Sequence, residues 1–157
     1  MAKYNINVQL ASQIAHVPDE KNLIKWAKLA LKSCTDVDSA TLTIRLVNQL
    51  EARNLNNAFR DKDYATNVLT FVYHEKTSRN LEGDIVLCAP VVNVEAKAQK
   101  KPTQNHYAHL TIHGVLHLAG LDHVKTKDAK VMEAQEVTLL KKLKITDPYA
   151  DGAVNLG

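Results

Sequence analysis

The 157-residue sequence predicts an α+β fold, a single domain in which a small four-stranded sheet packs on helices around one central, metal-bearing helix. Segments with alternating apolar residues, typical of half-buried strands, are mixed with segments whose apolar residues recur at helical spacing. One segment, after Pro102, is apolar around nearly its whole circumference, which is typical of a helix buried at the centre of a domain. With 45% hydrophobic residues, the chain can form one core of this kind.

The first half of the chain predicts two strands, each followed by a helix. Alternation over 4–10 predicts a strand, and segment 18–33, which opens with a proline and an aspartate, predicts a helix. A second strand is expected around 42–46, and a short helix from about 49 to 58. Trp26 repeats at helical spacing with its apolar neighbours, so we expect it in the core.

The second half predicts two more strands and the remaining helices. Strands are expected at 68–73 and 84–88, the latter introduced by Gly83, and a helix at 90–100 begins at its proline. After the central helix, a last helix is expected from about 127 to 143. Its inward face is predicted from apolar residues at helical spacing: Val131, Ala134, Val137 and Leu140.

Composition sets the limits of the domain and its surroundings. Residues 1–148 are expected to form the domain, and 149–157 a loose tail. The net charge of +3 permits a polyanionic partner without requiring one. Cys34 and Cys88 lie far apart and predict free thiols. Since no apolar run approaches the roughly twenty residues of a membrane span, we expect a soluble cytoplasmic protein with no membrane partner.

Three histidines in the segment His-Gly-Val-Leu-His-Leu-Ala-Gly-Leu-Asp-His predict a metal site. His113 and His117 are four positions apart and share one helix face. Gly120 permits a turn after the helix that can return His123 toward them. Three neutral imidazoles suit one zinc ion per chain and leave the fourth tetrahedral position to water, as in catalytic sites, although nickel also accepts such ligands.

Two further histidines, His106 and His109, lie on the same helical stripe as the pair. Because His123 supplies the third ligand, we expect these two to be hydrogen-bonded neighbours of the site or surface groups. They are therefore not assigned as ligands.

The spacing of the three histidines also resembles that of metzincin peptidases, so peptide hydrolysis is an alternative. In those enzymes the residue after the first histidine is the glutamate that acts as general base. Here that residue is Gly114, which has no side chain to move a proton. A peptidase would need its base elsewhere.

The histidine segment resembles most closely the signature of the bacterial YbeY family of endoribonucleases. Leu55-Asn56, Arg60 and Asp63, followed by the run 66–71, are similar to a second block of that family, and 83–85 to a third. The resemblance covers the chain from about 42 to about 145. The sequence departs from the family pattern at Ala65, Asn67 and Thr70, so no catalytic part is assigned to Asn67.

The resemblance implies a function and names one catalytic residue. It implies that His113, His117 and His123 bind zinc and that Arg60 takes part in RNA cleavage, where a guanidinium can hold the scissile phosphate by paired hydrogen bonds. The implied activity is single-strand-preferring endonucleolytic cleavage in rRNA maturation, including the 3′ end of small-subunit rRNA, and in ribosome quality control. The implied partners are ribosomal RNA and the ribosome or ribosomal proteins. A non-enzymatic ribosome-assembly factor with a structural zinc is the other alternative.

RNA contacts beyond Arg60 are weakly indicated. Phe71 or Tyr73 could stack a base, although aromatic residues in strands usually belong to the core. Lysines in two groups could follow the phosphates: Lys97, Lys100, Lys101, Lys125, Lys127 and Lys130. The lysines that end the last helix are expected to be solvated: Lys141, Lys142 and Lys144.

Overall fold

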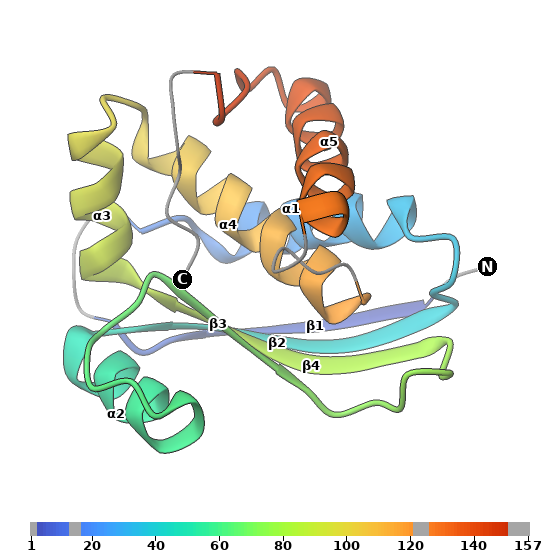
Figure 1. Cartoon of the computed structure of the whole chain (residues 1–157), viewed down its shortest axis with the longest axis horizontal. Coiled ribbons are helices and arrows are strands. Elements are labelled where there is room, and N and C mark those ends of the chain that lie inside the picture. The colour runs from blue at the N-terminus through green and yellow to red at the C-terminus, as the bar shows by residue number, and fades with distance from the viewer. Residues whose placement is uncertain (1–2, 13–16, 121–125, 151–157) are drawn as a thin grey trace.

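The computed structural model describes residues 3–12, 17–120 and 126–150, which form a four-stranded sheet and five helices (Figure 1). In chain order the elements are β1 (Lys3–Leu10), α1 (Glu20–Ser33), β2 (Ser39–Val47), α2 (Gln49–Arg60), β3 (Val68–Val72), β4 (Asn80–Cys88), α3 (Ala89–Ala98), α4 (Thr103–Leu118) and α5 (Thr126–Lys142). The predicted α+β class with a four-stranded sheet is confirmed. No helix in the described ranges has the length and apolar character needed to cross a membrane.

The strands lie in the order β1-β2-β4-β3. The pairs β1–β2 and β2–β4 are parallel, whereas β3 runs antiparallel to β4, with Thr70 opposite Ile85. This order follows from non-local pairing and could not be derived from the sequence. It makes β3 an edge strand, whose outer side is open to contacts from helices.

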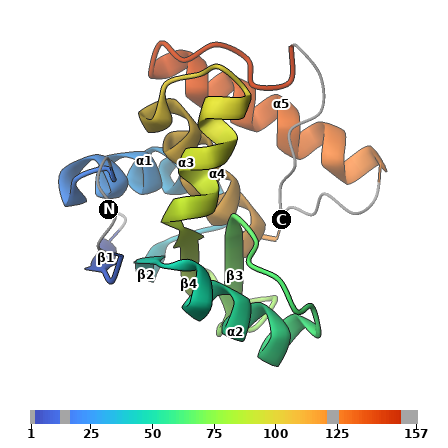
Figure 2. The same cartoon turned by 90° about the vertical axis from the view of Figure 1, so that its left-hand side faces the viewer.

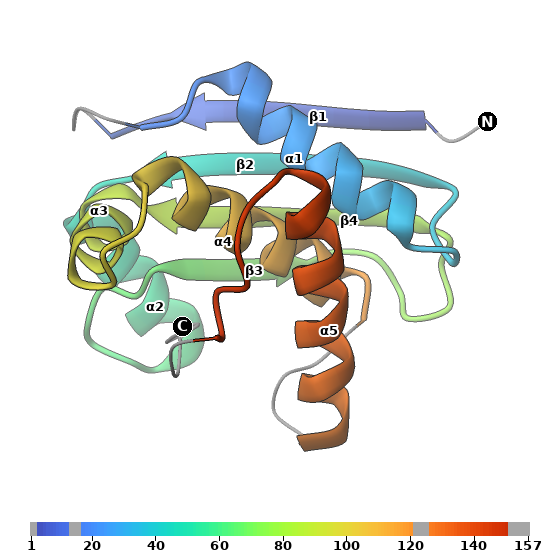
Figure 3. The same cartoon turned by 90° about the horizontal axis from the view of Figure 1, so that it is seen from above.

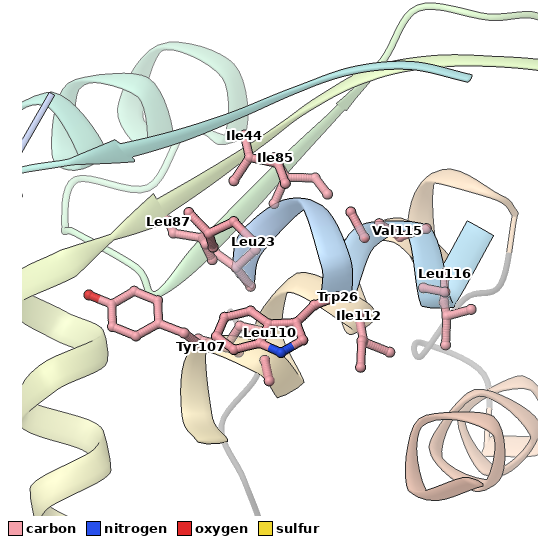
Figure 4. Close-up of a cluster of buried hydrophobic side chains, with 14 of the residues drawn as sticks. Leu23, Trp26, Ile44, Ile85, Leu87, Tyr107, Leu110, Ile112, Val115 and Leu116 are labelled. Carbon is pink, nitrogen blue, oxygen red and sulfur yellow. The ribbon is translucent and has the colours of Figure 1, made fainter. Parts of the chain in front are cut away.

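The helices cover the two faces of the sheet unequally. Figure 2 shows α1, α3, α4 and α5 on one face and α2 alone on the other. The main core lies between the sheet and the larger helical layer, and Figure 4 shows part of it, with Trp26 and Ile85 among side chains of α1, α4 and the strands. A smaller cluster packs under α2: Val47, Ala52, Leu69, Val86 and Cys88.

The central helix is α4, in which every residue from 106 to 116 is buried. Gly114 explains how this helix approaches the sheet so closely. A Cβ atom at this position would lie 3.0 Å from Cγ2 of Ile85 on β4, tighter than ordinary van der Waals contact. Any side chain at this position therefore requires Ile85 to shift, and a glutamate of the peptidase pattern could not be accommodated there without displacing Ile85.

The structure corrects the predicted start of the fourth strand. It was expected at Asp84, introduced by Gly83, but β4 begins at Asn80 and Gly83 lies inside it. A Cβ atom on Gly83 would lie 2.6 Å from the carbonyl oxygen of Phe71 and 2.8 Å from Cδ2 of Leu118. This glycine therefore marks a close approach within the fold and not a turn.

The predicted inward face of α5 is also wrong except at Leu140, which is buried. Val131 is 50% exposed, and the other buried side chains belong to an adjacent face: Met132, Glu136 and Leu139. Apolar spacing favoured the other stripe because a carboxylate is not expected in a core. The helix is rotated so that Glu136 faces α4, where it meets the histidines.

Candidate active site

Four histidines form a continuous stripe along α4. The ring centroids of His106 and His109 are 6.5 Å apart, and those of His109 and His113 are also 6.5 Å apart. His113 and His117 follow at 6.4 Å with nearly parallel rings, 26° apart. Helical spacing of three and four residues thus brings all four imidazoles side by side, as the sequence predicts.

The two predicted ligands on this helix are both held through Nδ1. The Nδ1 atom of His117 lies 2.9 Å from the Oγ1 atom of Thr70 on β3. The Nδ1 atom of His113 lies 3.3 Å from Oε1 of Glu136 on α5. Because Nδ1 is engaged in each ring, Nε2 is the nitrogen through which each ring could coordinate a metal.

The other two histidines are held through the opposite nitrogen. Nε2 of His106 lies 2.9 Å from Oε1 of Glu95 on α3, and Nε2 of His109 lies 2.7 Å from Oε1 of Glu136. Both rings are buried, and the Nδ1 atoms of both have no hydrogen-bond partner among the described residues. Of the two expected alternatives, hydrogen-bonded neighbours of the site or surface groups, these contacts agree with the first.

Glu136 links two histidines at the centre of the site. Its side chain is fully buried and also accepts a hydrogen bond from the hydroxyl of Tyr149, 3.0 Å from each carboxylate oxygen. Burial would raise the pKa of Glu136, but hydrogen bonds from His109 and His113 outweigh this and bring the pKa to about 2. Burial lowers the pKa of His109, against the opposing effect of Glu136, so this pair consists of a carboxylate and a neutral imidazole.

These contacts fit a metal ion on the histidine pair. Nδ1–H of His113 donates to an ionised carboxylate, which is the arrangement that orients metal-binding imidazoles and makes them more basic. No lysine or arginine of the described ranges contacts Glu136, so a cation on the imidazoles would balance its buried charge. The third predicted ligand, His123, lies outside the described residues.

The end of α4 has the predicted geometry. The helix ends at Leu118, and Gly120 has a φ of 103°, in the left-handed region that favours glycine. Its backbone N–H donates to the carbonyl of His117. Within the described ranges, no three metal-binding side chains surround a single point, so the complete ligand set stays a prediction.

Arg60 is connected to His117 through Thr70. It is the last residue of α2, and its Nη2 donates to the carbonyl oxygen of Thr70 at 2.6 Å, on the open edge of β3. Its guanidinium carbon lies 5.5 Å from the centre of the Phe71 ring. The hydroxyl of the same Thr70 contacts His117, so one residue connects the arginine with a predicted ligand.

Arg60 differs from the other arginines of the chain. Arg45 pairs with Glu51, Arg53 with Asp63 and Arg79 with Asp38, at distances of 2.6 to 2.9 Å. In the described part of the chain, Arg60 alone has no carboxylate partner. Its charge is therefore not neutralised by any described side chain and is available to an anion.

A pocket of about 520 Å³ adjoins Arg60 on the α2 side of the sheet. Phe59 and Phe71 line it and contact each other edge to face, with centroids 5.3 Å apart. Tyr73 also lines it, is 63% exposed, and donates a hydrogen bond from its hydroxyl to Asp84. The pocket therefore gives a base the space to contact Phe71 or Tyr73, as the sequence suggests.

Sequence reasoning missed three residues of the site: Thr70, Glu136 and Tyr149. Glu136 interrupts the buried stripe of α5, and a carboxylate within an otherwise apolar stripe is a signal that could have identified it. Tyr149 was expected to open a loose tail, but its hydroxyl contacts Glu136 and lies 3.1 Å from Nε2 of His109. That expectation is wrong for Tyr149, whereas 151–157 lie outside the described residues.

Comparisons with known proteins agree with the fold and the motifs. A family model described as Endoribonuclease YbeY matches residues 6–144. A protein named Endoribonuclease YbeY from Thiobacillus denitrificans is 48% identical over 142 residues, which cover 90% of this chain and 93% of that protein. A longer protein of the same name from Cupriavidus metallidurans is 50% identical over 133 residues, covering 85% of this chain and 65% of that protein.

A solved structure has the same fold. The solution structure of TM1509 from Thermotoga maritima aligns with a TM-score of 0.60 at 25% sequence identity. The alignment covers 92% of this chain and 98% of that one. The α+β arrangement described above is therefore shared over nearly the whole length of both chains.

Proposed function

The chain belongs to the YbeY family of endoribonucleases, and on that premise we propose that it hydrolyses phosphodiester bonds of single-stranded RNA with one bound zinc ion. The proposed role is rRNA maturation, including the 3′ end of small-subunit rRNA, and ribosome quality control. The proposed partners are ribosomal RNA and the ribosome or its proteins. The proposed zinc ligands are His113, His117 and His123, with Arg60 as the catalytic residue.

The observation that carries this proposal is the chain of contacts Arg60–Thr70–His117. The guanidinium donates to the Thr70 carbonyl at 2.6 Å, and the Thr70 hydroxyl lies 2.9 Å from Nδ1 of His117. An arginine without a described carboxylate partner is thus connected through one residue of the edge strand to an imidazole that could coordinate a metal. A phosphate bound by Arg60 would lie at the edge strand that also holds His117, which favours a phosphodiester over a peptide bond.

Zinc supplies the hydrolytic chemistry when bound, because it lowers the pKa of a coordinated water from about 15.7 toward about 7 and polarises a phosphoryl oxygen. Thr70 and Glu136 hold the imidazoles of His117 and His113 by hydrogen bonds to Nδ1, so that neither ring must be ordered during the reaction. Arg60 binds phosphate oxygens by paired hydrogen bonds and offsets the charge that develops on them. The aromatic pocket beside Arg60 offers space for a neighbouring base.

The test compares Arg60→Ala with Arg53→Ala on the same helix. Arg53 is exposed and bound to Asp63, so it controls for loss of a positive charge from α2. We expect Arg60→Ala to lower kcat/KM on single-stranded RNA by at least about 100-fold, as for loss of a donor that stabilises transition-state charge. Zinc affinity should be unchanged in both variants, and Arg53→Ala should cleave like wild type.

Four outcomes would contradict parts of this proposal. Undiminished cleavage by Arg60→Ala would remove that residue from the mechanism. A parallel fall in zinc affinity would mean that Arg60 acts by holding Thr70 and not by binding phosphate. Purified wild type that binds RNA or a ribosomal protein without cleaving RNA would identify an assembly factor, and chelator-sensitive cleavage of peptides alone would identify a peptidase.

A further inference from the structure

A groove with six lysines lies on the helical side of the molecule, between α1 and the end of α5. It has a volume of about 690 Å³ and is lined by Lys21, Lys25, Lys28 and Lys32 of α1 and by Lys142 and Lys144. All six are exposed, and half-buried Ile24, Leu29 and Leu143 also line the groove. Figure 3 shows the carboxyl end of α5 next to α1, which is how the two groups of lysines meet.

The lysines of α1 form one straight stripe. They are spaced by four, three and four residues, which places them on the same face of a helix. Eleven residues at a rise of about 1.5 Å span about 16 Å along the helix. At about 3.4 Å per stacked nucleotide, that length matches about five phosphates of one strand.

The groove is much more positively charged than the chain as a whole. The whole chain carries a net charge of only +3, with 20 basic and 17 acidic residues. Within the described ranges, no carboxylate lines the groove and none of the six lysines forms an ion pair. Like charges held together without counter-charges repel one another, and a bound polyanion relieves that repulsion while releasing its own counterions.

We propose that this lysine groove binds the RNA phosphate backbone outside the cleavage site, and the proposal rests on the RNA substrate proposed above. Among the described residues, no aromatic side chain lines the groove, so we expect its contacts to be with phosphates and independent of sequence. None of the exposed large apolar side chains of the described residues lines the groove either, so it offers no exposed apolar anchor for a lipid bilayer. A groove whose described charged residues are all lysines matches a linear polyanion.

The groove and the histidine site lie over opposite halves of the sheet. α1 contacts β1, at one edge, and also packs against α4, whereas His117 contacts Thr70 of β3, at the other edge. With the order β1-β2-β4-β3, these edges are three strand spacings, about 14 Å, apart. An RNA of a few nucleotides in the active site does not reach the lysine groove, whereas a longer RNA does.

The experiment uses the triple variant Lys21→Glu/Lys25→Glu/Lys28→Glu, which avoids Lys32 because that lysine stabilises the last turn of α1. The control is Lys3→Glu/Arg53→Glu/Lys76→Glu, three exposed basic residues outside the groove with the same total change in charge. A second variant, with glutamine at positions 21, 25 and 28, removes charge without reversing it. Circular dichroism checks that all variants fold.

Binding of a fluorescent single-stranded RNA of about 24 nucleotides is measured by anisotropy over a range of salt. We expect the groove variant to bind 10- to 100-fold more weakly at about 50 mM salt, with the glutamine variant intermediate. Loss of three phosphate contacts should reduce the slope of log Kd against log salt by about 2. For cleavage, KM should rise for the long RNA at unchanged kcat, and kcat/KM should not change for an RNA of about three nucleotides.

Because anisotropy requires no cleavage, failure of the proposed nuclease activity and failure of the groove are distinguishable. An unchanged Kd in the groove variant overturns the proposal, as does equal weakening in the control. Groove-dependent binding to phosphatidylglycerol vesicles, with unchanged RNA binding, also overturns it and identifies a membrane surface as the occupant.

Discussion

The two halves of the histidine stripe on α4 have the same residue type and the same helix face, yet they are bound in opposite ways. His106 and His109 direct Nε2 to the carboxylates of Glu95 and Glu136. His113 and His117 direct Nδ1 to Glu136 and Thr70. The first pair thus has Nε2 engaged within the protein, whereas the second pair has Nδ1 engaged.

This difference teaches how a ligand histidine can be recognised among similar neighbours. An imidazole that binds a metal through one nitrogen needs a partner on the other to fix its orientation and tautomer. Both pairs have such a partner, but on different nitrogens: Nε2 carries it in the first pair and Nδ1 in the second. Sequence spacing places four histidines on one stripe, and the hydrogen bonds separate the candidate ligands from their supports.

The largest expected effect comes from removing Nε2 at position 117. In His117→Asn, the amide can still contact Thr70 near the position of Nδ1 but has no atom at Nε2. We expect zinc affinity to fall by more than the 10- to 100-fold typical of an outer-shell partner, with the fold retained. Competition with a chromophoric chelator measures the affinity.

The matched control is His106→Gln, which keeps a donor near Nε2 for Glu95 and removes Nδ1. Zinc affinity should then be unchanged. Equal losses in the two variants would mean that the difference between the halves of the stripe does not decide metal binding.

A smaller effect is expected from Glu136→Gln. The amide keeps the size of the side chain but replaces one acceptor with a donor, so it cannot accept from His109, His113 and Tyr149 together. We expect zinc affinity to fall about 10- to 100-fold. The free energy of unfolding should fall by about 1–3 kcal/mol because a buried donor is left unpaired, as measured by urea denaturation.

Glu95→Gln is the control on the same stripe, because Glu95 holds His106 and not a predicted ligand. It should leave zinc affinity unchanged. If both substitutions lower zinc affinity equally, the two carboxylates act only on the stability of α4.

The smallest expected effect is that of Tyr149→Phe, which removes one hydrogen bond to Glu136. Zinc affinity should fall less than about threefold, well below the effect of Glu136→Gln, and the free energy of unfolding by about 1 kcal/mol. Tyr107→Phe, which removes a buried hydroxyl bonded to Asn93, should cost similar stability without changing zinc affinity. If zinc affinity fell more in Tyr107→Phe than in Tyr149→Phe, the assigned role of Tyr149 would be contradicted.

Local patterns in the sequence predicted much of this fold but not its close contacts. The predicted segments correspond to the strands and helices observed, and Trp26 is buried as expected. The error at Gly83 arose because a glycine inside a strand and one in a turn look alike until the approaching Leu118 is known. The wrong face of α5 has a similar cause, because the partners that make burial of Glu136 favourable lie on another helix.

The sequence alone determined the central helix, the stripe of four histidines with its glycine stop, and the absence of a general base at Gly114, because these depend on spacing along one element. Only the tertiary structure decided which nitrogen of each histidine is engaged, which arginine lies near the stripe, and which lysines gather in a groove. Thr70 and His117 are 47 positions apart, and His113 and Glu136 are 23 apart. Such contacts depend on strand order and helix rotation, which result from the packing of the whole chain.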